Sequence, residues 1–441
     1  MRFSCTTRCV PLGRLWAHGR TLPSSSKFII VMDQRRCMAS HTSSKPASSS
    51  AVTAVVVGGG ASGIAVVGNL LELLHPNSSV AWIDPLFQGG RINARYREVP
   101  SNTKVSYFLA YGEAVEPFRN IAEAAENPNA LTTLQSLSPD DTCSLHYAGE
   151  MLQMLSDGLL KNDRVASWKG TVNQAEWVDE SSAWSLSVQD DNSNESQRIT
   201  APLVVYCTGS SPTLVPLPKP LSRTPTLLDL DTSLKPSLLS ETLPRDREVS
   251  VGVIGASHSA VLVLMNLYAL SQSSHPLLRV RWFSRATQLK YAEDKGDWIL
   301  YDNTGLKGRA AQFARENLDG DKLSHSNVGK IISRIDCSGG PEKETQAMLQ
   351  ELPACGYIVQ AVGFTRDVLP NMKLDIAFNH QTGGFTDQKT RQPIPGLYGA
   401  GIAFPEQVVD PAGNVEYAVG FIKFMRFLNR VVPNWVEASV K

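Results

Sequence analysis

Closely spaced glycines follow an apolar run near the start of the chain. The run begins at Ala51 and ends at a Gly-Gly-Gly-Ala-Ser-Gly turn, after which apolar residues recur at helical spacing. This order predicts a buried strand, a tight turn and a helix. In such a turn Gly58 permits the sharp bend, Gly60 lets the backbone approach a diphosphate, and Gly63 allows the helix to pack on the strand. Ser62 lies at the start of the helix, where free N–H groups and the helix dipole favour phosphate.

An acidic residue completes this unit. The run Ser79–Ile83 predicts a second strand, and Asp84 follows it, about 20 residues beyond Gly63. A carboxylate in that position accepts a hydrogen bond from a ribose hydroxyl. The alternative is a glycine-rich turn without a ligand. The agreement of strand, turn, helix and acid favours a dinucleotide site.

A second strand, turn and helix are predicted from Arg247 onward. The turn contains Gly255, Ser257 and Ser259. Ser257 and Ala260 hold the places of the second and third glycines, and the serine hydroxyls can contact phosphate. A hydrolase nucleophile elbow would require glycine in place of Ser259, which disfavours that alternative. The pattern therefore predicts a second nucleotide site.

The strand that follows the second turn ends in Ser284-Arg285, where a site for NAD would have an acid. A guanidinium in this position can clamp a ribose 2′-phosphate, which selects NADPH over NADH. The alternative is an exposed loop arginine. His258, within the second turn, is expected to be a hydrogen-bonding neighbour of this nucleotide rather than a general acid.

A segment after the first acidic strand end resembles the flavin-containing monooxygenases. It reads Gly-Gly-Arg-Ile-Asn-Ala-Arg-Tyr over residues 89–96 and Pro-Ser-Asn-Thr-Lys over residues 100–104. In that family an asparagine of such a stretch lies over the reacting edge of the isoalloxazine ring. The resemblance implies this catalytic role for Asn102, with Arg91 and Lys104 beside FAD. The alternative for the asparagine is the cap of a turn.

Two later segments resemble parts of the wider superfamily of flavoproteins with two dinucleotide-binding domains. Thr208-Gly209 resembles the place where the chain touches the cofactor and turns toward the second domain, and a related Ala-Val-Gly recurs at 361–363. Gly401-Ile402 resembles the turn that carries the chain back to the flavin. Many relatives have an aspartate for the ribitol at the second of these positions, so the resemblance implies contacts through backbone N–H groups here.

The motifs together predict an α/β fold with two Rossmann-type domains. The resemblance implies an FAD-binding domain at 51–215 and 371–441, into which a smaller NAD(P)H-binding domain is inserted at 245–370. Helical spacing predicts helices over 144–161 and 414–428, the second with its start directed at the flavin. Alternating apolar residues predict a crossover β-meander, with runs at 164–178, 183–189 and 198–205.

The first fifty residues have the composition of a targeting segment. They contain six arginines and many serines, but Asp33 is their single acid. This composition predicts a transit peptide, most simply for mitochondria. The alternatives are a disordered tail or translation from Met32 or Met38, with the protein in the cytoplasm or a plastid.

Composition excludes several classes of function. Lys plus Arg equals Asp plus Glu at 42 each, which disfavours nucleic-acid binding. No apolar run is long enough to span a bilayer, so stable membrane insertion is not expected. The cysteines show no CxxC spacing, which disfavours a disulfide reductase, and no cluster of metal ligands is visible. Composition leaves open whether the chain forms a homodimer.

These observations predict an FAD-dependent, NADPH-using oxidoreductase, and the resemblance implies a flavin monooxygenase that acts on a small molecule. One departure from the family is the absence from residues 213–246 of the Phe-Gly-His signature that precedes the NADPH turn. The alternatives are an electron-transfer reductase with a quinone or protein acceptor, and a flavin-binding redox sensor with low turnover.

Overall fold

The computed structural model describes residues 52–190 and 196–440. The predicted transit segment therefore lies outside the described residues. Within the described ranges, no helix has the length and apolar character needed to cross a membrane.

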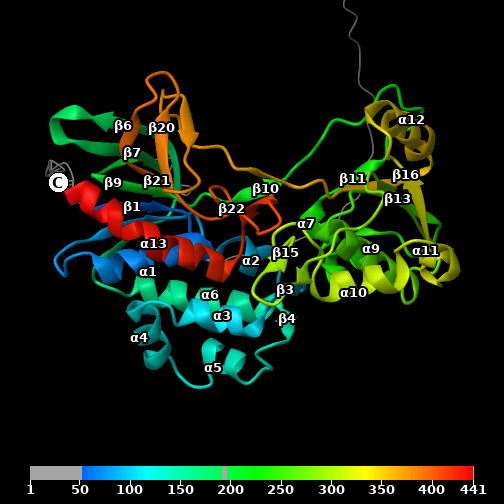
Figure 1. The fold of residues 1–441 in the computed structure, drawn as a ribbon, viewed down its shortest axis with the longest axis horizontal. Helices are drawn as coiled ribbons and strands as arrows, with labels where there is room; N and C mark the ends of the chain where they lie inside the picture. Colours follow the sequence, from blue (N-terminus) through cyan, green and yellow to red (C-terminus); the bar gives the residue numbers. More distant parts are fainter. Residues whose placement is uncertain (1–51, 191–195, 441) are drawn as a thin grey trace, which may run out of the picture. The chain divides into compact units, whose positions relative to one another are not determined.

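A seven-stranded mixed sheet is built from both ends of the described chain (Figure 1). Five of its strands run parallel in the order β5-β2-β1-β9-β21, and β20 and β19 continue the sheet in antiparallel orientation. In chain order the parallel strands read 3-2-1-4-5, as in dinucleotide-binding sheets. The strands are β1 (Ala54–Val57), β2 (Val80–Ile83), β5 (Val165–Trp168), β9 (Leu203–Tyr206), β19 (Ile376–Phe378), β20 (Gly384–Asp387) and β21 (Pro393–Gly399).

Both faces of this sheet are covered, which explains why its central strands are continuously apolar. Ala54 and Val56 belong to the core under the helices, whereas Val55 and Val57 belong to the core under a three-stranded antiparallel sheet. Helix α13 packs beside α1 in Figure 1. The covering elements are α1 (Ala61–Leu73), α3 (Val105–Gly112), α4 (Glu116–Ala124), α5 (Ala130–Gln135), α6 (Leu145–Leu160), α13 (Phe421–Val440), β6 (Thr171–Val178), β7 (Ala183–Gln189) and β8 (Ser196–Ala201).

A second sheet of five parallel strands has the order β11-β17-β12-β13-β16. Its edge strand β11 lies upstream of residue 245, and its apolar core is separate from those of the first sheet. The elements of this part are β11 (Thr226–Leu228), α7 (Leu230–Ser233), α8 (Pro236–Thr242), β12 (Val249–Ile254), α9 (His258–Ser271), β13 (Leu278–Ser284), β14 (Glu293–Asp294), β15 (Ile299–Leu300), α10 (Gly308–Asn317), α11 (Lys322–His325), β16 (Ile332–Asp336), α12 (Pro341–Glu351) and β17 (Tyr357–Gln360).

Short paired strands connect the larger parts. Strands β10 and β18 lie on the two chain segments that run between the sheets, and they pair in antiparallel orientation. Strand β3 pairs with β4, and β22 forms a hairpin with β23. The bounds are β3 (Pro100–Lys104), β4 (Thr142–Ser144), β10 (Ser210–Pro212), β18 (Phe364–Arg366), β22 (Glu406–Val409) and β23 (Val415–Ala418), and the short helix α2 spans Gly90–Arg95.

The helix predicted over 144–161 is confirmed as α6. The helix predicted over 414–428 is wrong in its first part, because Val415–Ala418 is a strand and α13 begins at Phe421. The valine and tyrosine of this strand favour extended backbone. Gly420, with φ +147°, separates strand from helix. The run predicted over 164–178 is divided between β5 and β6 at Gly170.

Candidate cofactor-binding site

The first glycine turn is fixed by backbone contacts at the carboxyl edge of the first sheet. The Gly58 N–H donates to the Ile83 carbonyl at 2.8 Å, and its carbonyl accepts from the Trp82 indole at 2.9 Å. The Cys207 N–H donates to the Val57 carbonyl at 2.7 Å. Three neighbouring strands, β1, β2 and β9, are therefore joined at the turn.

The second glycine turn repeats this arrangement on the second sheet. The Gly255 N–H donates to the Phe283 carbonyl at 3.1 Å, and its carbonyl accepts from the Trp282 indole at 2.7 Å. The Ala361 N–H donates to the Ile254 carbonyl at 2.8 Å. The two turns thus share one hydrogen-bond pattern, which agrees with the repetition seen in the sequence.

Glycine is required at the first position of each turn. Gly58 has φ +116° and Gly255 has φ +129°, a region that L side chains rarely adopt. A Cβ atom on Gly58 would lie 2.2 Å from the Cys207 carbonyl oxygen, and one on Gly255 would lie 2.3 Å from the Ala361 carbonyl oxygen. Both turns therefore exclude a side chain for steric as well as conformational reasons.

The start of α1 is packed closely against the backbone of neighbouring glycines. A Cβ atom on Gly63 would lie 1.8 Å from the Gly58 carbonyl oxygen, which explains the close packing of helix on turn. Gly60 precedes the helix without a side-chain cap from the described residues. Gly90 approaches it so closely that a Cβ there would lie 2.6 Å from the Gly60 Cα. Gly401 has φ +88°, and a Cβ there would lie 2.2 Å from the Ser62 Oγ.

Asp84 lies at the carboxyl end of β2, next to the first turn. Its Oδ2 accepts from the Gly59 N–H at 2.6 Å, and its Oδ1 accepts from the N–H groups of Leu86 and Phe87 at 2.9 and 2.7 Å. The carboxylate therefore holds the turn itself. Contact with a ribose stays a prediction.

The second turn has different side chains at the matching places. Ser257 precedes α9 and is exposed, Ser259 lies in its first turn, and Ala260 takes the place of a glycine. Ser284 is buried at the end of β13, in the position that Asp84 has on β2. Arg285 comes next, with its side chain 67% exposed and 3.5 Å from Glu344. The guanidinium is thus accessible for a ligand.

Buried polar atoms without a partner lie beside both turns. Among the described residues these include Thr208 Oγ1 and Ser210 Oγ after β9, and His258 Nδ1 after β12. A buried polar atom that makes no hydrogen bond costs about 1–3 kcal/mol, so such atoms are expected to face a ligand or water. Burial, together with the nearby Lys307 ammonium, lowers the pKa of His258 to about 4, so the imidazole is neutral at physiological pH.

The other predicted residues have the following surroundings. Asn102 is exposed on β3; its Oδ1 accepts from the Thr103 hydroxyl at 3.2 Å, and its amide nitrogen has no partner within the described ranges. Lys104 pairs with Asp140 at 3.1 Å on the surface. The hydrogen bond and charge of that carboxylate raise the pKa of Lys104.

Arg91 is held by residues between the two sheets. Its guanidinium forms an ion pair with Asp231 and donates to Ser211 Oγ at 2.9 Å. The Tyr96 hydroxyl donates to the same Asp231 at 2.7 Å. These contacts use both terminal nitrogens of the guanidinium. Its contact with FAD stays a prediction.

Gly209 and Ile402 lie at the remaining predicted positions. Gly209 has φ +82°, and its carbonyl accepts from the Asp367 N–H at 3.2 Å, which ties the two connecting segments together. The Ile402 side chain is 39% exposed directly after Gly401. An apolar residue there supplies no polar side-chain contact, in agreement with the departure noted in the sequence.

A concavity of about 700 Å³ lies elsewhere, between α1, α4 and α6. None of the predicted site residues lines it. The candidate site therefore rests on the two turns and on the geometry around them. Trp82 and Trp282, which fix these turns, were missed by sequence reasoning, although each lies two residues before the strand-end residue of its unit, Asp84 or Ser284.

Comparison with known proteins places the chain in a family. Monooxygenase AgnR1 from Paecilomyces divaricatus is 53% identical to this chain over 382 residues, which are 86% of this chain and 96% of AgnR1. The chain belongs to the AgnR1 monooxygenase family. No family model matches it. The prediction of an enzyme of the oxidoreductase class is confirmed by this relationship.

Two solved structures have a similar fold. Reduced ornithine hydroxylase PvdA from Pseudomonas aeruginosa has a TM-score of 0.58 at 12% identity, covering 89% of this chain and all of PvdA. Bacillithiol disulfide reductase Bdr from Bacillus cereus has a TM-score of 0.50 at 15% identity, with the same coverage of both chains. These two likenesses concern the fold alone, and they confirm the predicted mixed α/β class with parallel sheets.

Proposed function

We propose that this chain is an FAD-dependent monooxygenase that uses NADPH to insert one oxygen atom of O2 into a small-molecule substrate. The observation that carries the proposal is the 53% identity to a monooxygenase along nearly its whole length. The repeated turn supports it, because such an enzyme needs two nucleotide sites. In the reaction NADPH is oxidised, one oxygen atom enters the substrate, and the other leaves as water.

FAD is assigned to the first sheet, in a domain at 52–215 and 371–440. The uncapped start of α1, the glycine backbone around Gly60 and the unpartnered Thr208 hydroxyl fit a diphosphate with its ribityl chain. When bound, FAD supplies the redox chemistry, and this chain binds and orients it. The backbone at Gly401 packs on Ser62, and we assign this contact to the boundary of the FAD site.

NADPH is assigned to the second sheet, in a domain at 245–370 that is inserted in the first and preceded by β11. The start of α9 carries Ser257 and Ser259 for the diphosphate, and the accessible Arg285 suits the 2′-phosphate. His258 is neutral, so it can exchange hydrogen bonds with the nucleotide without adding charge. The antiparallel strands β6 to β8 form a meander that links β5 to β9 and covers one face of the first sheet.

Asn102 is the proposed catalytic residue. Its amide nitrogen, free of partners among the described residues, is available to orient the reacting edge of the flavin or the oxygen beside it. It lies on β3, which is paired with β4 at the start of α6. The strand gives this side chain a fixed place rather than a loop conformation.

The arginine-rich first fifty residues support import into mitochondria. A fluorescent protein fused after residue 50 should enter mitochondria if this proposal is right, and diffuse cytoplasmic or plastid fluorescence would contradict it. We also propose that the chain forms a homodimer. Light scattering of the full chain measures its molar mass and so tests this proposal directly.

Product analysis with isotopically labelled O2 tests the proposed reaction. The purified full chain is supplied with NADPH and offered a thioether, a tertiary amine, a cyclic ketone and a phenol. We expect one labelled oxygen atom in at least one product, with one NADPH consumed for each. Reduction of a quinone in the absence of any label uptake would instead identify an electron-transfer reductase. Negligible NADPH consumption would favour a redox sensor.

A further inference from the structure

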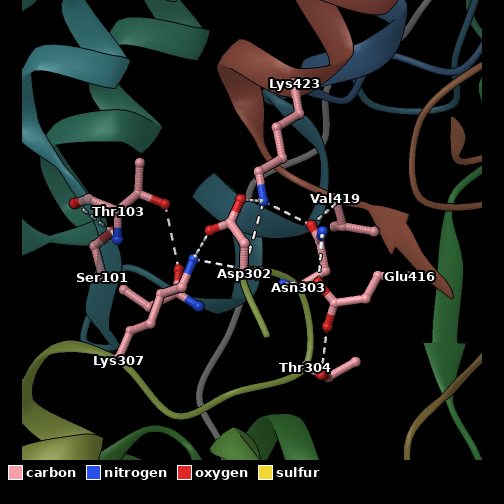
Figure 2. Close-up of polar contacts among 10 residues, drawn as sticks. Ser101, Thr103, Asp302, Asn303, Thr304, Lys307, Glu416, Val419 and Lys423 are labelled. Atoms are coloured by element: carbon pink, nitrogen blue, oxygen red, sulfur yellow. Dashed lines mark hydrogen bonds and ion pairs between the residues drawn. The ribbon is translucent and has the colours of Figure 1, made fainter. Parts of the chain in front are cut away.

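Three consecutive residues of one loop contact the C-terminal segment of the chain (Figure 2). Asp302, Asn303 and Thr304 lie between β15 and α10, in the part that contains the second sheet. Their partners are Glu416 on β23 and Lys423 in the first turn of α13, in the part that contains the first sheet. We call these five residues the clasp.

Glu416 is the buried centre of the clasp, with only 4% of its surface exposed. Its Oε2 accepts from the Asn303 N–H at 3.0 Å and from the Asn303 side-chain amide at 3.3 Å. Its Oε1 accepts from the Thr304 hydroxyl. Within the described residues, the hydrogen-bond donors to this carboxylate thus come from one short loop. A buried carboxylate that loses its donors is strongly destabilised, so the carboxylate and the loop hold each other.

Lys423 completes the contact from the helix. Its ammonium lies 2.7 Å from Asp302 Oδ2 and donates to the Asn303 side-chain oxygen at 2.6 Å. Asp302 also pairs with Lys307 at the start of α10. Burial alone would raise the pKa of Asp302, but the hydrogen bonds and charges of the two lysines outweigh it and lower the pKa.

The strand that carries Glu416 has its polarity reversed. Val415 and Tyr417 are 58% and 47% exposed, whereas Glu416 between them is buried. A half-buried strand ordinarily directs its apolar residues inward. Here the inward side is occupied by the carboxylate and its loop, so the clasp sets the orientation of the hairpin. Such a local conflict with patterning is expected at functional positions.

The loop is stiff where it enters the clasp. Tyr301 has φ +55°, which is uncommon for a residue with a bulky side chain. A Cβ atom on Gly305 would lie 2.2 Å from the Ala292 nitrogen, so the loop packs tightly on the segment after β13. We therefore expect a displacement of the C-terminal segment to move the segment after β13 as well.

The clasp also lies beside the proposed catalytic strand. A Cβ atom on Gly308, which follows Lys307, would lie 3.2 Å from the Ser101 carbonyl oxygen, and Asn102 is the next residue of β3. Figure 2 shows Ser101 and Thr103 in the same field as Asp302 and Lys307. The clasp thus joins the part assigned to NADPH with β3 and the start of α13 in the part assigned to FAD.

We propose that Glu416 is a positioning residue for hydride transfer. By holding the loop at Asn303 and Thr304, it fixes the nicotinamide nucleotide on the second sheet relative to the flavin on the first. In this step a hydride passes from NADPH to FAD, so NADPH is oxidised and FAD reduced. The proposal rests on the function proposed above. Glu416 itself does not touch the reacting atoms.

The test compares two carboxylates of the same hairpin. Glu416→Gln keeps the shape and one acceptor oxygen but removes the charge that holds the loop. Glu406→Gln is the matched control, because Glu406 pairs with Arg430 on α13 at 2.8 Å and, among the described residues, forms no hydrogen bond or ion pair with the loop. Amide hydrogen exchange of residues 301–307 and anaerobic reduction of bound flavin by NADPH are measured in the full chain. Reduction by dithionite, which needs no nucleotide site, is the reference reaction.

In the Glu416→Gln variant, we expect the amides of residues 301–307 to exchange at least tenfold faster. We also expect NADPH to reduce the bound flavin at least tenfold more slowly. Flavin content and the rate with dithionite should be unchanged, and Glu406→Gln should match the wild type. Thr304→Val removes a single donor from the loop side, so it should change both quantities in the same direction by a smaller factor. Thr304→Val provides the same test if the Glu416→Gln variant does not fold.

If amide exchange and the rate of flavin reduction were unchanged in these variants, Glu416 would not hold the loop, and the proposal would be overturned. Faster exchange with an unchanged rate of reduction would leave only a structural contact and overturn the positioning role. A wild-type chain that binds no flavin, or is not reduced by NADPH, would instead refute the proposed function. The exchange measurement can be read in that case as well, so the two failures are distinguishable.

Discussion

The carboxyl edges of the two parallel sheets are alike in backbone and different in side chains. In each, a glycine with positive φ follows the first strand, accepts a hydrogen bond from a tryptophan indole, and lies against the carbonyl of the residue directly after a third strand. Beyond the glycine the units diverge, because Asp84 holds the first turn whereas Ser284 and an exposed Arg285 occupy the second. The shared backbone suits a diphosphate in both turns, and we propose that the strand-end residues choose the nucleotide.

Replacing the two turn glycines with alanine should distinguish the two nucleotide sites most strongly. Gly58→Ala and Gly255→Ala each place a Cβ against a carbonyl oxygen in a strained backbone, at a cost on the order of 3 kcal/mol or more. We expect Gly58→Ala to lose bound flavin, and Gly255→Ala to keep flavin but lose reduction by NADPH. Flavin absorbance and anaerobic reduction measure the two effects.

Gly296→Ala is the control for these variants. Gly296 also has positive φ, +93°, but a Cβ there meets nothing within 4 Å. It should therefore cost only the backbone strain and leave both sites active. If Gly255→Ala lost its flavin as readily as Gly58→Ala, the assignment of one nucleotide to each sheet would be contradicted.

Removal of the exposed guanidinium should change the choice of nucleotide. Arg285→Gln is expected to weaken NADPH binding by roughly tenfold to a hundredfold, about 1.4–2.8 kcal/mol, because a charge-assisted bond to phosphate is lost. NADH binding should be unchanged. Arg279→Gln, an exposed arginine of the same strand, should affect neither nucleotide. Equal weakening of both nucleotides would disprove the role of Arg285 in selecting the 2′-phosphate.

His258 should make folding sensitive to acid. Its pKa in the folded chain, about 4, is below its ordinary 6.5, so above pH 6.5 the ring is neutral in both states. As pH falls from 6.5 toward 4, the unfolded chain gains a proton that the folded chain resists, and stability is lost. The loss at pH 5 is on the order of 2 kcal/mol relative to pH 7.5. His258→Gln should reduce this loss, as measured by urea unfolding at both pH values, and an equal loss would contradict the buried neutral ring.

The smallest expected effect concerns the feature that the two turns share. Trp82→Phe and Trp282→Phe each remove an indole N–H that donates to the turn glycine, at a cost of about 1 kcal/mol or somewhat more. The first should weaken flavin retention and the second NADPH binding. Dissociation of flavin on dilution and titration with NADPH measure this. Identical effects of both variants on flavin alone would show that the turns do not act separately.

Local sequence patterns predicted the parts of the fold that depend on residues close together in the sequence. The strand, glycine turn and helix at Gly58 and at Gly255 each lie within about 30 residues, so their periodicity is visible without tertiary contacts. The prediction over 414–428 was wrong at its start because a short strand and a helix both carry closely spaced apolar residues.

Long-range polar contacts were not predictable in this way. Glu416 and Asn303 are separated by 113 residues, and Arg91 and Asp231 by 140, so no local pattern joins them. A glutamate between apolar strand residues was the one available signal for the clasp. Likewise, Asp84 was located correctly by spacing, but its hydrogen bonds to the turn follow from tertiary geometry.

The central claim, that one sheet holds FAD and the other NADPH, is tested most directly by an absorption spectrum of the purified full chain followed by anaerobic titration with NADPH and with NADH. We expect the spectrum of an oxidised flavin, which is bleached by NADPH at lower concentration than by NADH. A protein without flavin, or a bound flavin that neither nucleotide reduces, would contradict it.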